Sequence, residues 1–425
     1  MVDIVGVIKP PERKMFSKSK KTFQRSNKPL MFIFSVLISS TALSSDLPMG
    51  SPESVGVSSD RLDRLSESMQ RYIDSNQLAG TVSVISRKGK VIHFESQGFK
   101  SKENREAMSD DTIFFIMSMT KPIVSTALMM LYEEGKFKLD DPLYKFIPEF
   151  QNITVKKGKK EKPIKNHIKV IDILRHSAGF GFKGPEGYRK SIGINLEEFV
   201  KESIKTPLSY EPGTQWRYSY STDICGYLVE VLSGLTLDKF LKTRIFDPLK
   251  MNDTFFELPK EKINRFTTLY NKEKNGELNV FDSPSESPFT DNVTLFSGAG
   301  GLLSTTSDYL IFCQMLLDGG VYNDMRLIKS STLDLMLEDH ADGLKYKGFV
   351  FGKKKGFGLG FEVVNKTDTK FGSKGTYGWG GMFGTYYRID PVENMIFIYM
   401  TQSFETYKLK LADKFRDLVY DSILE

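Results

Sequence analysis

The sequence predicts a mixed α/β (α+β) protein, in which an antiparallel sheet built from both ends of the chain is flanked by helices and a mainly helical region is inserted between its two parts. Three observations support this fold class. Runs of β-branched and aromatic residues lie near both ends, at about 46–115 and 345–425. Helical periods broken by Gly and Pro turns fill about 116–344. The chain of 425 residues, 40% hydrophobic and 26% charged, has enough apolar side chains for one large or two smaller domains.

Residues 1–45 are predicted to be a basic leader with a signal peptide. Lys and Arg are frequent among the first 28 positions, and an apolar run at 30–38 and small side chains as far as Ser44 follow them. An apolar run of about ten residues is shorter than the ~20 that a membrane-spanning helix needs. We therefore expect cleavage and a secreted or periplasmic protein. An uncleaved leader that anchors the chain in the inner membrane is the alternative, and no other membrane contact is expected.

The first expected elements after the leader are a helix and a hairpin. Apolar residues at helical spacing predict a helix over 58–74, with Ser58 or Ser59 as its N-cap. Two β-rich runs at 80–86 and 91–95 enclose a short basic turn with a glycine, which is typical of a β-hairpin.

The C-terminal part of the chain returns to strands. Runs at 357–364, 385–390 and 395–400 each predict a strand, and residues 409–423 predict a helix that covers one face of the sheet. Strands at both ends of a chain with helices between them favour one sheet assembled from the two termini.

Charge, cysteine and histidine patterns exclude several classes of function. Much of the net charge of +6 lies in the leader and in the lysine run at 156–160, which we expect to be a solvated loop or an edge hairpin. No nucleic-acid partner is therefore expected. Cys225 and Cys313 lie in apolar segments and are expected to be buried free thiols. The four histidines lack ligand spacing, so neither a metal nor another cofactor is expected.

A serine and a lysine lie one helical turn apart, Ser118 and Lys121, where a long apolar run ending at Gly135 begins. Pro122 suits the first turn of a helix, so Ser118 is predicted to lie at or just before the helix N-terminus. Residues three apart share a helix face, which brings the lysine amine near the serine hydroxyl. A serine hydroxyl becomes a good nucleophile when a base takes its proton, and a lysine in a water-poor pocket can be that base. Spacing alone also permits a capping serine beside a lysine that reaches the surface.

Further motifs give this pair a context. In chain order they are Ser118-Met119-Thr120-Lys121-Pro122, Glu133-Glu134-Gly135-Lys136, Leu139-Asp140-Asp141-Pro142, Ile173-Leu174-Arg175-His176-Ser177-Ala178-Gly179, Pro212-Gly213-Thr214, Trp216-Arg217-Tyr218-Ser219-Tyr220-Ser221-Thr222-Asp223, Ser297-Gly298-Ala299-Gly300-Gly301-Leu302-Leu303-Ser304-Thr305, Gly356-Phe357-Gly358-Leu359-Gly360 and Tyr377-Gly378-Trp379-Gly380-Gly381. With this set the chain resembles serine hydrolases of the class C β-lactamase and penicillin-binding-protein-like superfamily, most closely the family VIII carboxylesterases. The resemblance runs from about residue 52 to the C-terminus. It implies one hydrolase domain over 46–425 with the β-lactamase/transpeptidase-like fold.

The resemblance implies roles for individual residues. Ser118 is the nucleophile, Lys121 is its base, and Tyr218 is the hydroxyl that shares the proton and delivers it to the leaving group. The N–H groups of Ser118 and Met382 are the implied oxyanion donors. Glycines on a strand let substrate approach the backbone closely. The implied substrate strand includes Trp379, Gly380 and Gly381.

Two departures from the β-lactamase pattern favour ester substrates. β-Lactamases and transpeptidases carry Lys-Thr-Gly where this chain has Trp379-Gly380-Gly381, and their substrates need a cation to hold a carboxylate. Lys374 and Arg388 lie nearby in the sequence as possible substitutes. The second departure is Tyr220, a substrate-binding position by resemblance, where β-lactamases have the Asn of Tyr-x-Asn.

The sequence therefore predicts a serine hydrolase that cleaves small carboxylic esters through an acyl-enzyme on Ser118, so its expected partner is a small-molecule ester or amide. One alternative is a β-lactamase or D-aminopeptidase acting on β-lactams or D-amino-acid peptides. Another is a non-catalytic penicillin-binding-like protein, against which the complete serine, lysine and tyrosine set argues. His176 is a weaker candidate for a base, because its segment is structural in the resembling family. Segments 179–203 and 264–292 are expected to shape the pocket.

Overall fold

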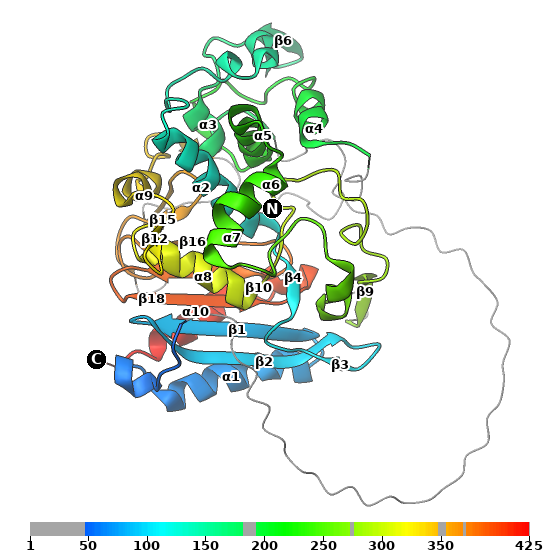
Figure 1. Cartoon of the computed structure of the whole chain (residues 1–425), viewed down its shortest axis with the longest axis vertical. Coiled ribbons are helices and arrows are strands. Elements are labelled where there is room, and N and C mark those ends of the chain that lie inside the picture. The colour runs from blue at the N-terminus through cyan, green and yellow to red at the C-terminus, as the bar shows by residue number, and fades with distance from the viewer. Residues whose placement is uncertain (1–46, 182–192, 273–275, 347–353, 369–370, 425) are drawn as a thin grey trace, which may run out of the picture.

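The computed structural model describes residues 47–181, 193–272, 276–346, 354–368 and 371–424, so the predicted leader lies outside the described residues. Its largest element is an eight-stranded antiparallel sheet (Figure 1). From one edge to the other its strands are β14 (Lys355–Phe357), β15 (Glu362–Val364), β16 (Tyr377–Gly380), β17 (Tyr386–Asp390), β18 (Met395–Met400), β1 (Gly80–Arg87), β2 (Lys90–Ser101) and β3 (Glu106–Ala107). The sheet thus combines strands from the two ends of the folded chain, which confirms the predicted fold class.

Strand β1 joins the two parts of the sheet. It pairs with β2, which follows it through a tight turn, and with β18 from the end of the chain. In the register with β18, Val82 lies opposite Met400 and Val84 opposite Ile398. Alternate side chains of β18 enter two different apolar clusters, because neighbouring side chains of a strand point to opposite faces. The centre of the sheet is therefore buried on both faces.

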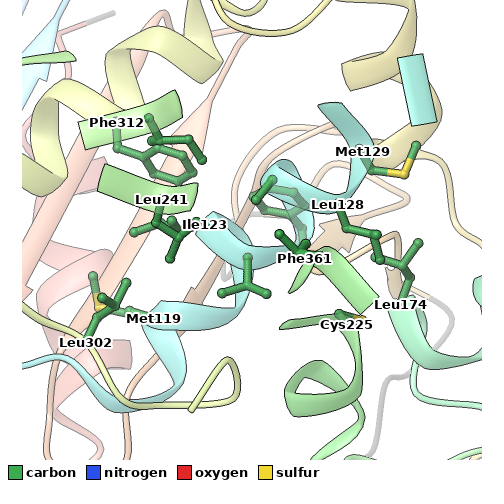
Figure 2. Packing of buried hydrophobic residues seen from close by; sticks show 14 of the residues in the cluster. Met119, Ile123, Leu128, Met129, Leu174, Cys225, Leu241, Leu302, Phe312 and Phe361 are labelled. Carbon is green, nitrogen blue, oxygen red and sulfur yellow. The ribbon is translucent and has the colours of Figure 1, made fainter. Parts of the chain in front are cut away.

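Helices cover both faces of the sheet. The helices α1 (Ser59–Asp74) and α10 (Leu411–Asp421) pack on one face, and α8 (Thr306–Leu317) packs on the other (Figure 1). On the α8 side lies α2 (Thr120–Glu133), whose residues from Thr120 to Leu131 are all buried. Figure 2 shows its packing through Met119, Ile123, Leu128, Met129, Cys225, Leu241, Phe312 and Phe361. The helix that follows Ser118 is thus fixed in the main core.

The region between the two parts of the sheet contains helices and short strand pairs. Its other helices are α3 (Val170–Leu174), α4 (Leu196–Ser203), α5 (Ser221–Ser233), α6 (Leu237–Leu241), α7 (Asp247–Leu249) and α9 (Ser330–Leu337). The strand pairs are β4 (Ile113–Phe115) with β10 (Leu303–Thr305), β5 (Thr154–Lys157) with β6 (Lys160–Pro163), β7 (Gln215–Trp216) with β13 (Lys345–Tyr346), β8 (Leu269–Lys272) with β9 (Leu278–Asp282), and β11 (Val321–Tyr322) with β12 (Met325–Arg326). These strands are too short to produce a clear alternating pattern, so the sequence did not predict most of them.

Most predicted elements are present with small shifts at their ends. The helix over 58–74 is α1, capped by Ser58, whose Oγ accepts the Arg61 N–H at 3.3 Å. The lysine run forms the exposed hairpin β5–β6. The single strand predicted over 357–364 is wrong, because the chain forms two strands there, β14 and β15. Gly360 between them has φ +100°, a left-handed conformation that interrupts a strand.

Three further observations concern the described residues as a whole. Cys225 and Cys313 are buried free thiols, as predicted. No described helix combines the length and the apolar character needed to cross a membrane. Within the described ranges, no three His, Cys, Asp or Glu side chains come together as a metal site.

Candidate active site

Ser118 lies where a strand gives way to a buried helix. Strand β4 ends at Phe115, a 3-10 turn over Met117–Met119 follows, and α2 begins at Thr120. Met117 has φ +48°, a conformation that costs a residue other than glycine about 1–3 kcal/mol and is kept mainly at functional sites. The serine is thus held just before a helix N-terminus, as the sequence predicts. There the helix dipole and free backbone N–H groups favour developing negative charge.

The amine of Lys121 is directed at the serine. Its Nζ atom lies 3.1 Å from Ser118 Oγ and 2.6 Å from the carbonyl oxygen of Ala299. The lysine is only 3% exposed, and burying an ammonium away from water is costly. A surface-directed lysine, the alternative that spacing left open, is therefore excluded. The geometry is that of a base within reach of a nucleophile.

A buried carboxylate that the sequence analysis did not single out supports this pair. Asp223, on α5, accepts the Ser297 hydroxyl at 2.6 Å and the Ala299 N–H at 3.0 Å. Ala299 is also the residue whose carbonyl meets Lys121. Burial raises the pKa of Asp223, and the hydrogen bonds from Ser297 and Ala299 and the charge of Lys121 offset part of that rise. An acidic residue in a largely apolar helix was the available signal, since buried acids are rare unless paired.

The ring of Tyr218 also lies beside the lysine amine. Its ring centroid is 4.7 Å from Lys121 Nζ, and its side chain is buried. Its hydroxyl accepts a hydrogen bond from Trp379 Nε1 at 3.2 Å. Trp379 comes from β16, so this contact joins the helical region to the main sheet. The structure therefore brings together Ser118, Lys121, Tyr218 and Trp379, as the resemblance implies.

The end of β16 lies against the turn that carries the serine. A Cβ atom placed on Gly381 would come within 2.4 Å of the Ile116 carbonyl oxygen, so only glycine fits. Thr385 reinforces this contact by donating its hydroxyl to the same carbonyl at 3.1 Å. Met382 follows directly, and no backbone carbonyl in the described part of the chain accepts its N–H. Two backbone N–H groups beside the nucleophile fit the oxyanion site that the resemblance implies.

His176 is buried behind Tyr218 and makes no described hydrogen bond to Ser118. Its ring lies 4.9 Å from the Tyr218 ring, and its Nδ1 atom is 3.4 Å from Ser219 Oγ. Burial lowers the pKa of His176 well below its ordinary value, and the charge of Lys121 lowers it further. The histidine is therefore a neutral packing group in this fold.

The structure places the three remaining candidate residues elsewhere. Tyr220 gives its hydroxyl to the Ser203 carbonyl at 3.4 Å and packs beside Phe180 and Phe199, so substrate contact by Tyr220 stays a prediction. Arg388 is buried in an ion pair with Glu362. Lys374 is exposed and precedes β16, at the end of the strand opposite Gly380. Neither cation takes the place of the absent lysine. Of the two pocket segments, residues 182–192 and 273–275 lie outside the described residues.

Comparison with known proteins supplies the family. The family model described as beta-lactamase matches residues 65–421, well over half of the chain. The chain belongs to the β-lactamase family. Protein Rv1367c of Mycobacterium tuberculosis (strain H37Rv) is 29% identical to it over 364 residues, 80% of this chain and 90% of that protein. A Salmonella typhimurium (strain LT2) protein provisionally named D-alanyl-D-alanine carboxypeptidase is 27% identical over 383 residues, 83% of this chain and 85% of that protein.

Solved structures share the fold of this β-lactamase-family protein. EstCE1, described as a hydrolase with promiscuous acyltransferase activity, has a TM-score of 0.72 at 24% identity, covering 85% of this chain and 98% of its own. Unliganded simvastatin synthase LovD from Aspergillus terreus has a TM-score of 0.71 at 22% identity, with the same two coverages. The chain is thus an enzyme of the β-lactamase-like serine hydrolases. The arrangement of a hydroxyl, a base, a second hydroxyl and two amides is suited to acyl transfer.

Proposed function

We propose that this serine hydrolase cleaves small carboxylic esters through an acyl-enzyme on Ser118. The observation that carries the proposal is the 3.1 Å separation between Lys121 Nζ and Ser118 Oγ, on a turn packed against Gly381. A nucleophile within reach of a base and beside free backbone N–H groups has the parts that acyl transfer requires. No cofactor enters the proposed reaction.

In the proposed reaction, Lys121 takes the proton of Ser118 as Oγ attacks the ester carbonyl. The oxyanion that forms lies between the N–H groups of Ser118 and Met382, and losing one such donor typically costs about 3 kcal/mol in the transition state. Tyr218 gives a proton to the departing alcohol. Water then attacks the acyl-enzyme, and the same groups release the carboxylic acid.

The proposed preference for esters is supported by the side chain of Trp379 on β16, where related enzymes carry a lysine. The indole of Trp379 occupies the position where the resemblance places a lysine in β-lactamases and transpeptidases. Arg388 is held by Glu362, and Lys374 lies at the other end of the strand. A substrate carboxylate would find no replacement cation from these two residues, whereas an uncharged ester needs none.

The second candidate substrate is a D-amino-acid peptide or a β-lactam. It is favoured by the 27% identity to the Salmonella protein named as a D-alanyl-D-alanine carboxypeptidase. The proposed catalytic steps would be the same, with an amide or lactam nitrogen as the leaving atom. A non-catalytic binding protein remains the third possibility, and a test for acylation separates it from both.

The decisive experiment compares p-nitrophenyl esters from acetate to decanoate with a chromogenic cephalosporin. We expect turnover of the short and medium esters, at least about 100-fold loss in Ser118→Ala and in Lys121→Met, and a mass increase on Ser118 after reaction with a slow ester. Ser125→Ala is the matched control, because Ser125 is a buried serine of α2, the helix that follows Ser118, and its hydroxyl has no partner in the described part of the chain. Faster turnover of the cephalosporin would favour the second candidate. An unreactive Ser118 would favour the binding protein.

We also propose that the enzyme acts in the periplasm or outside the cell after loss of its leader. The basic and apolar composition of residues 1–45 supports this location. Expression of the full chain, followed by cell fractionation and N-terminal sequencing, tests the proposal. A cytoplasmic protein that keeps residue 1 would contradict it, and an intact protein in the inner membrane would support the anchor.

A further inference from the structure

We infer that the indole of Trp379 is a positioning residue that fixes the direction in which Tyr218 delivers its proton. This inference rests on the proposed function and assigns a proton-directing task to a side chain that the sequence analysis treated as part of the substrate strand and as the replacement for a lysine. The hydrogen bond of 3.2 Å between Trp379 Nε1 and the Tyr218 hydroxyl carries it.

The direction follows from the chemistry of the two groups. An indole N–H can only donate a hydrogen bond, whereas a phenol both donates and accepts. The oxygen of Tyr218 must therefore accept from Trp379, and its own proton must point to a different side. The amine of Lys121 lies next to the Tyr218 ring, 4.7 Å from the centroid. The inferred path of the phenolic proton is therefore away from Trp379 and toward the pair of Ser118 and Lys121, which are 3.1 Å apart.

The surrounding packing holds the indole in this orientation. Trp379 stands on β16 opposite Tyr387 of β17, and its ring lies 5.3 Å from that of Tyr218 and 5.4 Å from that of Phe357. The Tyr218 ring in turn lies 4.9 Å from His176. Aromatic rings packed at such distances restrict one another's rotation. The Trp379 N–H therefore stays aimed at one oxygen before substrate arrives.

The hydrogen bond from Trp379 to Tyr218 takes its effect during acylation. The bond between Ser118 Oγ and the acyl carbon forms, and the bond from that carbon to the leaving oxygen breaks. The Ser118 proton passes to Lys121, and the leaving oxygen takes the phenolic proton of Tyr218. The phenolate left on Tyr218 accepts the Trp379 N–H more strongly than the phenol did, because hydrogen bonds to charged acceptors are stronger. The ammonium of Lys121 then returns a proton to the phenolate, and both groups are restored.

Two esters of the same acid test this inference. p-Nitrophenyl butyrate releases a phenolate that needs little help from an acid, and ethyl butyrate releases an alkoxide that must be protonated. For Trp379→Phe we expect kcat/KM to fall by about 10- to 100-fold for ethyl butyrate, the effect of losing a hydrogen bond to a charged group. For p-nitrophenyl butyrate we expect a fall of less than about 3-fold. kcat/KM covers the steps up to acylation, and the two esters differ only in their leaving group. A change in the ratio of kcat/KM for ethyl butyrate to that for p-nitrophenyl butyrate therefore reports on how the leaving group departs.

Three further variants complete the experiment. Trp216→Phe removes the N–H of the other tryptophan in the same aromatic cluster, and we expect the ratio of the two kcat/KM values to stay at the wild-type value. Tyr218→Phe should lower the ratio of kcat/KM for ethyl butyrate to kcat/KM for p-nitrophenyl butyrate more than Trp379→Phe does. The double variant should match Tyr218→Phe, because both changes interrupt one pathway.

An equal loss of both activities in Trp379→Phe would overturn the inference and make the tryptophan a structural or substrate-packing residue. An additive double variant would overturn it as well. A wild-type enzyme that hydrolyses neither ester would instead refute the proposed function, so the two failures are distinguishable.

Discussion

Asp223 and Lys121 are linked through the two backbone polar groups of a single residue. The Asp223 carboxylate accepts the Ala299 N–H at 3.0 Å, and the Ala299 carbonyl lies 2.6 Å from Lys121 Nζ. A buried carboxylate thus fixes the loop that holds the lysine amine, and this amine faces the Ser118 hydroxyl. The position of the Lys121 amine therefore depends on the Asp223 carboxylate, which it reaches only through Ala299.

Replacing Asp223 by Asn should slow catalysis without removing substrate binding. The amide keeps one acceptor for Ala299 but removes the negative charge, so the lysine is held less firmly. We expect kcat for p-nitrophenyl butyrate to fall by about ten-fold, equivalent to about 1.4 kcal/mol, with KM changed by less than about two-fold. Glu230→Gln is the matched control, since Glu230 lies on the same helix and accepts the Leu237 N–H at 2.8 Å, away from the site. Equal losses of kcat in both variants would contradict the prediction.

Adding one methyl group at Gly381 should separate the substrate strand from the nucleophile turn. Its Cβ atom would lie 2.4 Å from the Ile116 carbonyl oxygen and 2.2 Å from Thr385 Oγ1, so β16 must move. We expect Gly381→Ala to lower kcat by at least about 100-fold, because a displaced oxyanion donor loses most of its effect. At Gly380 the nearest atom to an added Cβ would be 3.3 Å away, so Gly380→Ala should have a clearly smaller effect. Kinetics beside circular dichroism separates loss of the site from loss of the fold.

The buried ion pair of Arg388 and Glu362 should stabilise the fold and should not contribute to binding of a negatively charged substrate. Burial alone raises the pKa of Glu362, but Arg388 and Lys355 outweigh this and leave the pKa below its ordinary value. The pair therefore stabilises the fold above about pH 4 and loses this effect as the glutamate is protonated at lower pH. Removing one partner of such a pair typically costs about 3–5 kcal/mol.

Thermal unfolding of Arg388→Met at pH 7 measures this cost, and we expect a clear fall in Tm. Lys374→Met replaces an exposed lysine near the same strand and should leave Tm unchanged. We expect Lys374→Met also to leave KM for negatively charged and neutral esters unchanged. A selective rise in KM for the charged ester would show that Lys374 binds the substrate carboxylate after all.

Asp308, in the first turn of α8, should make the fold less stable as the pH rises toward 7. Burial raises the pKa of Asp308 to about 7, although the Asp253 N–H and the Thr254 hydroxyl donate to its carboxylate. The unfolded value is about 3.9, so the protonated form favours folding. The stabilisation of the fold that comes from protonated Asp308 is complete below about pH 4 and is lost as the pH rises through about 7. The free energy of unfolding falls by up to about 1.4 kcal/mol per pH unit in this range.

The pH dependence of Asp308→Asn tests this prediction. We expect the difference in unfolding free energy between the variant and the wild type to shift in favour of the variant between pH 5 and pH 8. Taking the difference between the variant and the wild type cancels the effects of the other carboxylates on stability, several of which change with pH in the opposite direction. Urea unfolding at four pH values measures it, and a difference that does not change with pH would refute the assignment.

The sequence alone was sufficient for features that depend on local pattern. Alternating and helical periods located α1, the β1–β2 hairpin and β18, and the spacing of Ser118 and Lys121 predicted that the two side chains meet at the N-terminus of α2. Tyr218 and Met382 came from the resemblance only, because no local pattern distinguishes either residue from others of its type.

Features that depend on tertiary contact were not predictable in this way. The task of Asp223 depends on a loop more than 70 residues away in the chain. The pairing of β4 with β10 and the break at Gly360 arise from packing between distant segments. Likewise, Arg388 was a candidate cation until its buried partner Glu362 was known, since exposure and pairing are properties of the folded chain.

The pairing of β1 with β18 and of the serine turn with β16 has a consequence for biosynthesis. Ser118 leaves the ribosome about 13–50 s before Gly381 at ordinary elongation rates, so a nascent chain carries the proposed nucleophile without the proposed oxyanion site. Until β18 is made, β1 also presents an unpaired apolar edge, which favours association with other chains. During synthesis the proposed site is therefore incomplete, and the chain is most vulnerable to association with other chains. A factor that shields the β1 edge would protect the chain until its last hundred residues arrive.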